Sequence, residues 1–141
     1  MIKIVETEKE MQDALSVRKS VFVDEQGVSL EAEIDDLEDI CKHVILYEDN
    51  KPAAVGRYRS YESGLAKIER VAVMKPYRKY GFGKVVMDFI NSNAKEEGFR
   101  GSILNGQTHA KGFYNKLGYQ VEGEEFLEEG IPHYKMKLIY E

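Results

Sequence analysis

The first half of the chain alternates between apolar and polar residues over short segments, as half-buried β-strands do. Residues 2–5 form one such segment, and residues 43–47 and 53–59 form two more. The turn-rich stretch Glu48-Asp49-Asn50-Lys51-Pro52 separates the latter two, which predicts an antiparallel hairpin. Residues 66–73 predict a third strand beside this hairpin.

A helix is predicted between the first strand and the hairpin. Thr7 and Glu10 form a capping box, in which a hydroxyl and a carboxylate satisfy free backbone N–H groups. Apolar residues then recur at helical spacing to about Val23, and Gln26-Gly27 ends the pattern. In residues 29–42, a dense acidic stretch, we expect a loop with a short helix and a solvated acidic face. If this stretch lined a substrate cleft, it would favour a cationic amine.

The second half changes to a strand–helix–strand pattern. Residues 83–94 have helical spacing, Gly98 can end that helix, and residues 102–105 predict a strand parallel to residues 66–73. The remaining elements are a helix over residues 109–117 and strands over residues 119–121 and 134–139. The fold class is therefore α+β, with one domain over residues 1–141. Its mixed sheet should have six to seven strands, helices on both faces and a βαβ unit.

Composition and charge limit the partners. The chain has 20 basic and 25 acidic side chains and a net charge of −5, so nothing attracts it generally to nucleic acid or to an anionic membrane. No apolar run approaches the roughly 20 residues of a membrane helix, and the charged N-terminus is unlike a signal peptide. Cys41 is the only cysteine, which excludes an intramolecular disulfide and favours a reducing, cytoplasmic location.

The segment after the third predicted strand carries the candidate chemistry. The strand ends in Val71-Ala72-Val73, and a basic turn with two glycines then leads into a helix. Glycine lets the turn amides converge, and the first helical turn adds free N–H groups and the positive end of the helix dipole. Such a site suits pyrophosphate. Val85 and Val86 stand where the nucleoside-triphosphate and dinucleotide loops need Ser or Thr and Gly, so both loops are disfavoured.

This turn, Arg78-Lys79-Tyr80-Gly81-Phe82-Gly83, resembles the Arg/Gln-x-x-Gly-x-Gly/Ala motif of the GNAT superfamily of N-acetyltransferases. The segment from Ala110 to Tyr119 resembles that superfamily's second motif, a helix ending in Phe-Tyr-x-x-x-Gly-Tyr/Phe. Residues 17–27 and 128–136 resemble a bacterial subgroup, the ElaA/YjcF-like proteins. The resemblance therefore extends over most of the chain.

The resemblance implies acetyl-CoA as co-substrate. The strand would splay from its parallel neighbour and bind pantetheine through the main chain of Val71, Ala72 and Val73. The pyrophosphate would lie on the turn, formed by Arg78, Lys79, Tyr80, Gly81, Phe82, Gly83 and Lys84. On the other arm of the splay, Asn105 and Gln107 could bond pantetheine amides or substrate. The remaining expected cofactor contacts are Ala110, Phe113 and Tyr114.

Direct acyl transfer needs a base for the acceptor ammonium and an acid for the departing thiolate. Tyr114 is the implied acid, because the family places a phenol of this motif beside the cofactor sulfur. Glu69 is the predicted base, and strand alternation would put its side chain on the face of Val71 and Val73. Glu69 fits a salt bridge equally well, with Arg57, Arg59 or Arg70. The alternative bases are His109, His133 and a water molecule.

These residues predict an acyl-CoA-dependent N-acetyltransferase that acts by direct attack on a primary amine of a small molecule or peptide. The alternative is a non-catalytic acyl-CoA-binding or sensor protein. A nucleic-acid-binding domain is disfavoured by the acidic charge. No metal is expected, because the three histidines are scattered along the chain. Exposed sheet edges would allow a homodimer.

Overall fold

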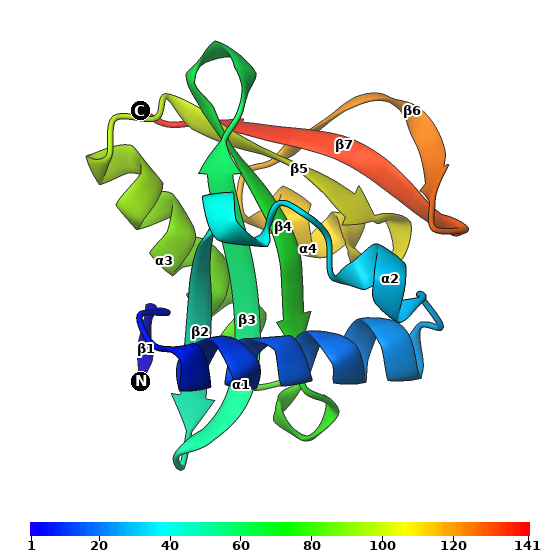
Figure 1. Ribbon diagram of the computed structural model, residues 1–141. Coiled ribbons are helices and arrows are strands. Elements are labelled where there is room, and N and C mark those ends of the chain that lie inside the picture. The colour runs from blue at the N-terminus through cyan, green and yellow to red at the C-terminus, as the bar shows by residue number, and fades with distance from the viewer.

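A mixed sheet of seven strands runs through the protein in the order β1-β2-β3-β4-β5-β7-β6, as seen in a computed structural model of residues 1–141 (Figure 1). Only β4 and β5 pair in parallel, and the other neighbours are antiparallel. The predicted α+β mixed sheet is confirmed. The strands are β1 (Ile2–Ile4), β2 (Lys42–Glu48), β3 (Lys51–Ser60), β4 (Leu65–Val73), β5 (Gly101–Gln107), β6 (Gln120–Glu128) and β7 (Ile131–Ile139).

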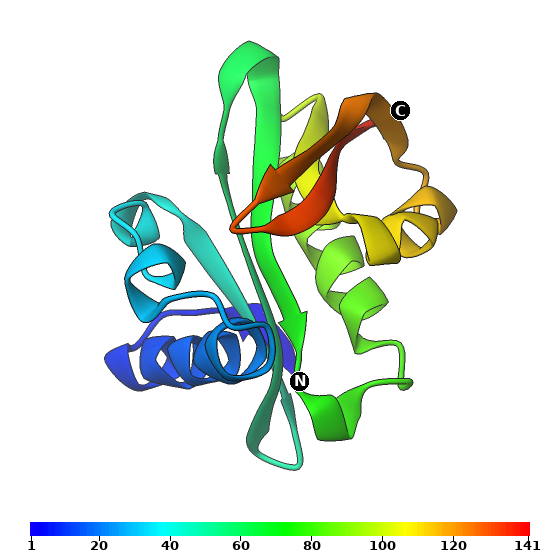
Figure 2. The ribbon, with the colours of Figure 1, turned by 90° about the vertical axis from the view of Figure 1, so that its right-hand side faces the viewer.

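Helices cover both faces of the sheet, with α1 and α2 on one side and α3 and α4 on the other (Figure 2). They are α1 (Glu8–Arg18), which continues into the π-helical segment Lys19–Glu25, α2 (Leu30–Glu33), α3 (Phe82–Glu96) and α4 (Lys111–Lys116). The capping box at α1 is present, because the Glu10 amide donates to Thr7 Oγ1 at 3.1 Å and the Thr7 amide donates to Glu10 Oε1 at 3.1 Å. No helix is long and apolar enough to cross a membrane.

Two hydrophobic layers hold these helices on the sheet. Under α3, the side chains of Val86, Met87 and Ile90 are completely buried. Gly56 allows this close approach, since a Cβ there would lie 2.9 Å from Val86 Cγ1. Under α1, a smaller cluster joins Ala14, Val17 and Val21 to Ile45, Val55 and Ala72 of the sheet.

The C-terminal hairpin is longer than predicted. Strands were expected over residues 119–121 and 134–139, whereas β6 and β7 together extend from Gln120 to Ile139 with a short turn at Glu129-Gly130. Residues 122–125 are exposed and rich in glutamate, so they lack the apolar alternation of a half-buried strand. These residues belong to a strand because β6 pairs with β7, which itself pairs with β5. Their polar sequence gives no sign of this pairing.

The acidic stretch between α1 and β2 is not simply a solvated face, and that expectation is wrong for three of its carboxylates. Glu33, Asp35 and Glu38 bind the guanidinium groups of Arg18 and Arg57, whose side chains are 2% and 1% exposed. The Arg18–Glu33 and Arg57–Asp35 contacts are both 2.8 Å. The stretch is therefore fixed to the sheet by buried ion pairs.

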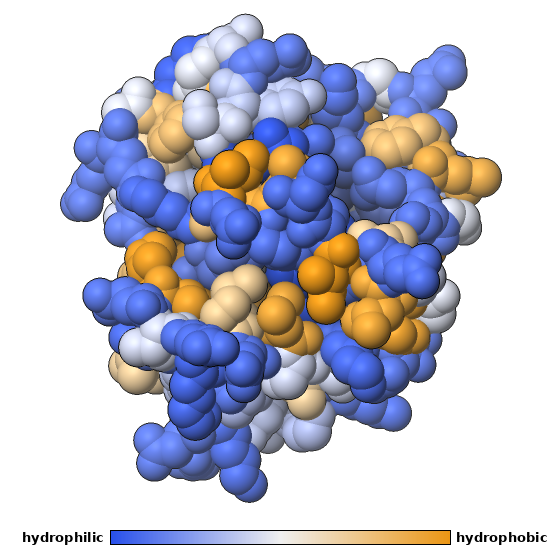
Figure 3. Space-filling model, in the orientation of Figure 1, coloured by the Kyte–Doolittle hydropathy of each residue, from blue (hydrophilic) through white to orange (hydrophobic).

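Some apolar side chains of the same stretch reach the surface instead. Leu30, Ile34 and Ile40 are exposed, and the space-filling view shows apolar patches scattered among hydrophilic side chains on this face (Figure 3). Three carboxylates of the stretch thus point inward while several apolar residues point outward, the reverse of the usual arrangement.

Candidate functional site

A cleft opens where β4 and β5 separate. The two strands pair from Leu65–Gly101 to Ile68–Leu104 and no further. Beyond that point, residues of both strands line a cavity of about 860 Å³. The strand edges that face each other there lack a ladder partner in the protein, so their N–H and C=O groups are available to an extended ligand. The predicted splay is present.

A bulge in β4 turns the strand at the start of this cleft. Arg70 has a positive φ of 59°, and Gly56 of β3 lies opposite both Arg70 and Val71, because the register shifts between Val55 and Arg57. A bulge of this kind inserts one extra residue and reverses the alternation beyond it.

The bulge corrects the predicted direction of Glu69. This residue pairs with Arg57 and faces the α1 side, where Arg57 also binds Asp35. Val71 and Val73 pack against the core under α3 on the opposite face. The predicted common face for Glu69 and these valines is wrong, because the alternation rule assumes an uninterrupted strand.

The glycine-containing turn ends in free helical amides beside the cleft. Gly81 begins α3 in a left-handed conformation with φ 78°, and Lys79 has φ 77°. The first intrahelical bond runs from the Val85 amide to the Gly81 carbonyl at 3.2 Å, so the amides of Phe82, Gly83 and Lys84 precede it. These three free N–H groups and the positive end of the helix dipole are features that can bind an anion.

Two of the three cationic side chains of the turn are already paired. Arg78 binds the Glu25 carboxylate with both terminal nitrogens at 2.9 Å, and its Nε donates to the Val73 carbonyl at 3.0 Å. Lys84 pairs with Asp88 at 2.6 Å. Arg78 therefore holds the turn against the π-helical segment. Of the three cationic side chains, Lys79 is the one whose charge is not paired with a carboxylate.

Tyr114 of α4 reaches the cleft by packing over Gly106 of β5. A Cβ on Gly106 would lie 2.9 Å from Cδ2 and from Cε2 of the Tyr114 ring, so the missing side chain makes the space. The ring packs edge-on against Phe113 with centroids 5.0 Å apart. Burial raises the pKa of Tyr114 to about 12, so its phenol stays protonated at neutral pH.

Comparison with known proteins identifies the family. Residues 6–140 match the model of the acetyltransferase (GNAT) domain. The uncharacterised N-acetyltransferase YjcF of Bacillus subtilis is 44% identical over 134 residues, which cover 94% of this chain and 95% of YjcF. The chain belongs to the GNAT acetyltransferase family. The predicted resemblance to the YjcF-like proteins is confirmed, and this acetyltransferase is an enzyme of the acyltransferase class.

Solved structures agree with the observed fold of this GNAT protein. An acyl-CoA N-acyltransferase from Pseudomonas aeruginosa superposes with a TM-score of 0.86 at 27% identity, covering 97% of this chain and 96% of that one. A Bacillus anthracis protein assigned as a streptothricin acetyltransferase, in complex with acetyl coenzyme A, gives a TM-score of 0.64 at 25% identity, covering 72% of this chain and 63% of that one.

Nearly all predicted site residues of this acetyltransferase line the same cleft. These are Glu69, Val71, Ala72, Val73, Arg78, Lys79, Gly81, Phe82, Gly83, Lys84, Asn105, Ala110, Phe113 and Tyr114. Tyr80 is the exception, because its side chain is 69% exposed and packs on the Phe82 ring outside the lining. Only the backbone of Tyr80 remains a predicted contact.

The three candidate bases also line the cleft but differ in their partners. Glu69 Oε1 accepts from Arg57 at 3.1 Å and from Arg59 at 3.4 Å, so this carboxylate is part of the ion-pair network. His109 is exposed, and its Nε2 lies 2.6 Å from Gln107 Oε1. His133 belongs to β7 and is buried, with 6% of its surface exposed.

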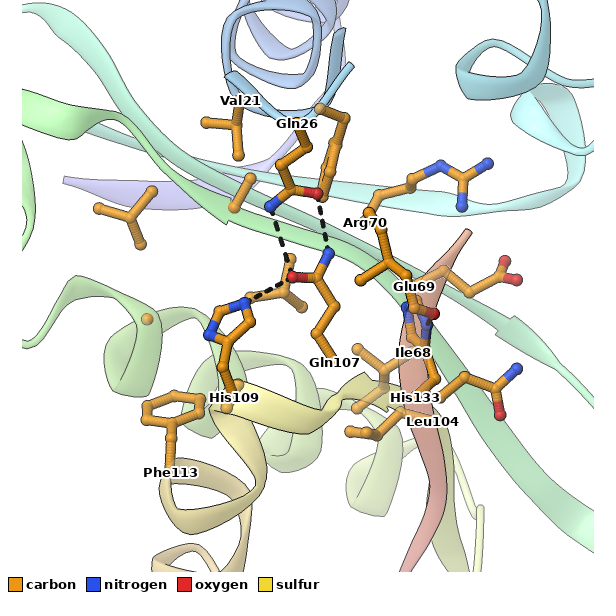
Figure 4. A pocket seen from close by; sticks show the side chains of 18 of the residues that line it. Val21, Gln26, Ile68, Glu69, Arg70, Leu104, Gln107, His109, Phe113 and His133 are labelled. Atoms are coloured by element: carbon orange, nitrogen blue, oxygen red, sulfur yellow. Dashed lines mark hydrogen bonds between the residues drawn. The ribbon is translucent and has the colours of Figure 1, made fainter. Parts of the chain in front are cut away.

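Gln26 and Glu128 are two of the cleft residues that were not singled out from the sequence. Gln26, at the end of the π-helical segment, exchanges amide hydrogen bonds of 2.8 and 3.4 Å with Gln107 of β5, across a sequence separation of 81 residues (Figure 4). Glu128, at the end of β6, accepts from Asn105 at 3.4 Å. No local pattern marks either residue, because both reach the cleft through tertiary packing.

Proposed function

We propose that the protein transfers the acetyl group of acetyl-CoA to a primary amine by direct attack. The observation that carries this proposal is the unpaired edge of β4 and β5, which leads directly to the free amides at the start of α3. An extended pantetheine arm fits the first feature and a pyrophosphate fits the second. Binding of acetyl coenzyme A to the Bacillus anthracis relative supports this choice of co-substrate.

The predicted cofactor residues take distinct parts in this proposal. The main chain of Val71, Ala72 and Val73 would bond the pantetheine amides, and one of these N–H groups would polarise the thioester carbonyl. The amides of Phe82, Gly83 and Lys84 would bind the pyrophosphate, assisted by the unpaired charge of Lys79.

Tyr114 would supply the proton that the leaving thiolate needs. As the amine nitrogen bonds to the carbonyl carbon, the C–S bond breaks and the phenol proton moves to sulfur. A phenol whose pKa is raised to about 12 by burial remains protonated at neutral pH, so Tyr114 keeps a proton that it can donate as negative charge develops on sulfur in the transition state. The tyrosinate recovers a proton released by the acylated nitrogen.

Acetyl transfer can be measured directly. We expect release of the coenzyme A thiol from acetyl-CoA when the protein is supplied with a panel of aliphatic primary amines, and mass spectrometry should find one added acetyl group on the amine. The alternative is a non-catalytic acyl-CoA sensor. Acetyl-CoA binding without amine-dependent thiol release across the whole panel would support the sensor and contradict the enzyme proposal.

A further inference from the structure

At the β6–β7 hairpin the cleft is lined by the imidazole of His133, which has only one hydrogen-bond partner. The His133 ring is 6% exposed and stacks on Phe126 with centroids 5.9 Å apart. Its Nδ1 lies 2.6 Å from the Ile131 carbonyl. Because a carbonyl oxygen can only accept, Nδ1 must carry the proton, and Nε2 of the neutral ring is then a bare acceptor.

A carboxylate faces this bare nitrogen. Glu128 Oε2 lies 3.5 Å from His133 Nε2, and the other oxygen, Oε1, accepts from Asn105 Nδ2 at 3.4 Å. Two acceptors therefore lie next to each other at the cleft wall without a protein donor between them. A cation bearing N–H groups satisfies both of them at once, and a primary ammonium has three such donors.

His133 and Tyr114 approach the slot between β4 and β5 from opposite faces. His133 lies directly opposite Gln107 in the β5–β7 ladder, so their side chains share one face. Tyr114 lies on the other face, beneath Gly106. In Figure 4 the Gln26–Gln107 pair lies between Phe113 and His109 on one side and His133 and Glu69 on the other.

We propose that Glu128 and His133 bind the reacting ammonium of a cationic aliphatic primary amine and that His133 Nε2 is the general base. The proposal rests on the acetyl transfer proposed above. One ammonium proton passes to Nε2, and Glu128 stabilises the imidazolium that forms. The freed lone pair attacks the thioester carbonyl carbon, the C–S bond breaks, and sulfur takes its proton from Tyr114. The second nitrogen proton leaves through solvent and restores the tyrosine.

Glu69 is then not the general base. Both of its contacts, with Arg57 and Arg59, are made through Oε1 within the buried ion-pair network. It fixes the start of the β4 bulge on the α1 side and acts as a positioning residue. The Glu69 carboxylate is already bound by Arg57 and Arg59. His133 makes no ion pair with an arginine or lysine, so its neutral ring can accept a proton.

His133→Asn tests the base, because the Asn side-chain amide can still donate to the Ile131 carbonyl while the Nε2 acceptor is lost. With n-butylamine and acetyl-CoA, we expect kcat/KM for the amine to fall roughly 100- to 10,000-fold. Glu128→Gln should raise KM for n-butylamine about tenfold. Glu124→Gln, a substitution on the exposed part of β6 outside the cleft, should leave both constants unchanged.

A base can be separated from a structural residue by changing the amine. 2,2,2-Trifluoroethylamine is largely neutral at neutral pH, so no proton has to be removed before its attack. The loss in His133→Asn should therefore be at least about tenfold smaller with this amine than with n-butylamine. Titration of each variant with acetyl-CoA should give the wild-type affinity.

The outcomes distinguish this inference from the proposed function. If His133→Asn turned over n-butylamine as fast as the wild type, His133 would not be the general base, and the proposed acetyl transfer would stand. An equal loss with both amines would make His133 a structural residue and overturn its catalytic part. A wild type that acetylates other amines but not n-butylamine would contradict the acceptor class. A wild type that neither binds acetyl-CoA nor releases its thiol would overturn the proposed function itself.

Discussion

Tyr114→Phe is expected to lower kcat for acetyl transfer roughly 100- to 1,000-fold, since general acid catalysis contributes on this scale. Phenylalanine keeps the ring that fills the space beside Gly106 and packs against Phe113, so acetyl-CoA should bind with unchanged affinity. Steady-state thiol release and calorimetric titration measure the two quantities separately.

Tyr61→Phe is the matched control, because it removes the same hydroxyl from a tyrosine outside the cleft. Its kcat should equal that of the wild type. Since burial raises the pKa of Tyr114 to about 12, wild-type kcat should also show no decline from phenol ionisation up to about pH 10. A Tyr114→Phe enzyme with wild-type kcat would show that another group or water protonates the thiolate.

Arg57→Ala is expected to lower the free energy of unfolding by about 3–5 kcal/mol, the usual cost of removing one partner from a buried ionic network. Arg57 is 1% exposed and binds Asp35, Glu38 and Glu69 at 2.8 to 3.1 Å. Its loss leaves these partly buried carboxylates without their main counter-charge. Urea denaturation followed by circular dichroism measures the effect.

Lys9→Ala provides the comparison for an exposed pair. Lys9 lies 2.9 Å from Asp13 with its side chain 82% exposed, and its loss should change stability by less than about 1 kcal/mol. An equally small effect of Arg57→Ala would mean that the network does not hold the acidic stretch on the sheet.

The same network sets an acid limit to stability. Hydrogen bonds from Arg57 lower the pKa of Asp35 below its ordinary value. A carboxyl group with a lowered folded-state pKa stabilises the fold above its unfolded pKa of about 3.9, and this contribution is lost as the pH falls further. The wild type should therefore lose stability on acidification below about pH 4, and Arg57→Ala should lose less.

The sequence was sufficient to predict the elements that carry strong local signals. The capping box at Thr7, the β2–β3 hairpin, and the strand, glycine turn and helix from Ile68 to Ala94 were all predicted and are all present. Each depends on residues close together in the chain. The family motifs added the splay of β4 and β5, which no local pattern contains.

The features that escaped prediction depend on distant partners. The direction of Glu69 follows from the bulge at Arg70, and nothing in the β4 sequence distinguishes a bulged arginine from a regular one. The acidic stretch reads as solvated because its arginine partners Arg18 and Arg57 come from α1 and β3. The bond between Gln26 and Gln107 likewise forms only once β5 and the π-helical segment are in place.

The central claim is that the slot between β4 and β5, with the start of α3, binds acetyl-CoA. Isothermal titration of the protein with acetyl-CoA tests this most directly. We predict saturable binding to one site, weakened several-fold by Lys79→Ala because one charge-assisted phosphate contact is lost and weakened further by added salt. No binding at high micromolar acetyl-CoA would contradict the account.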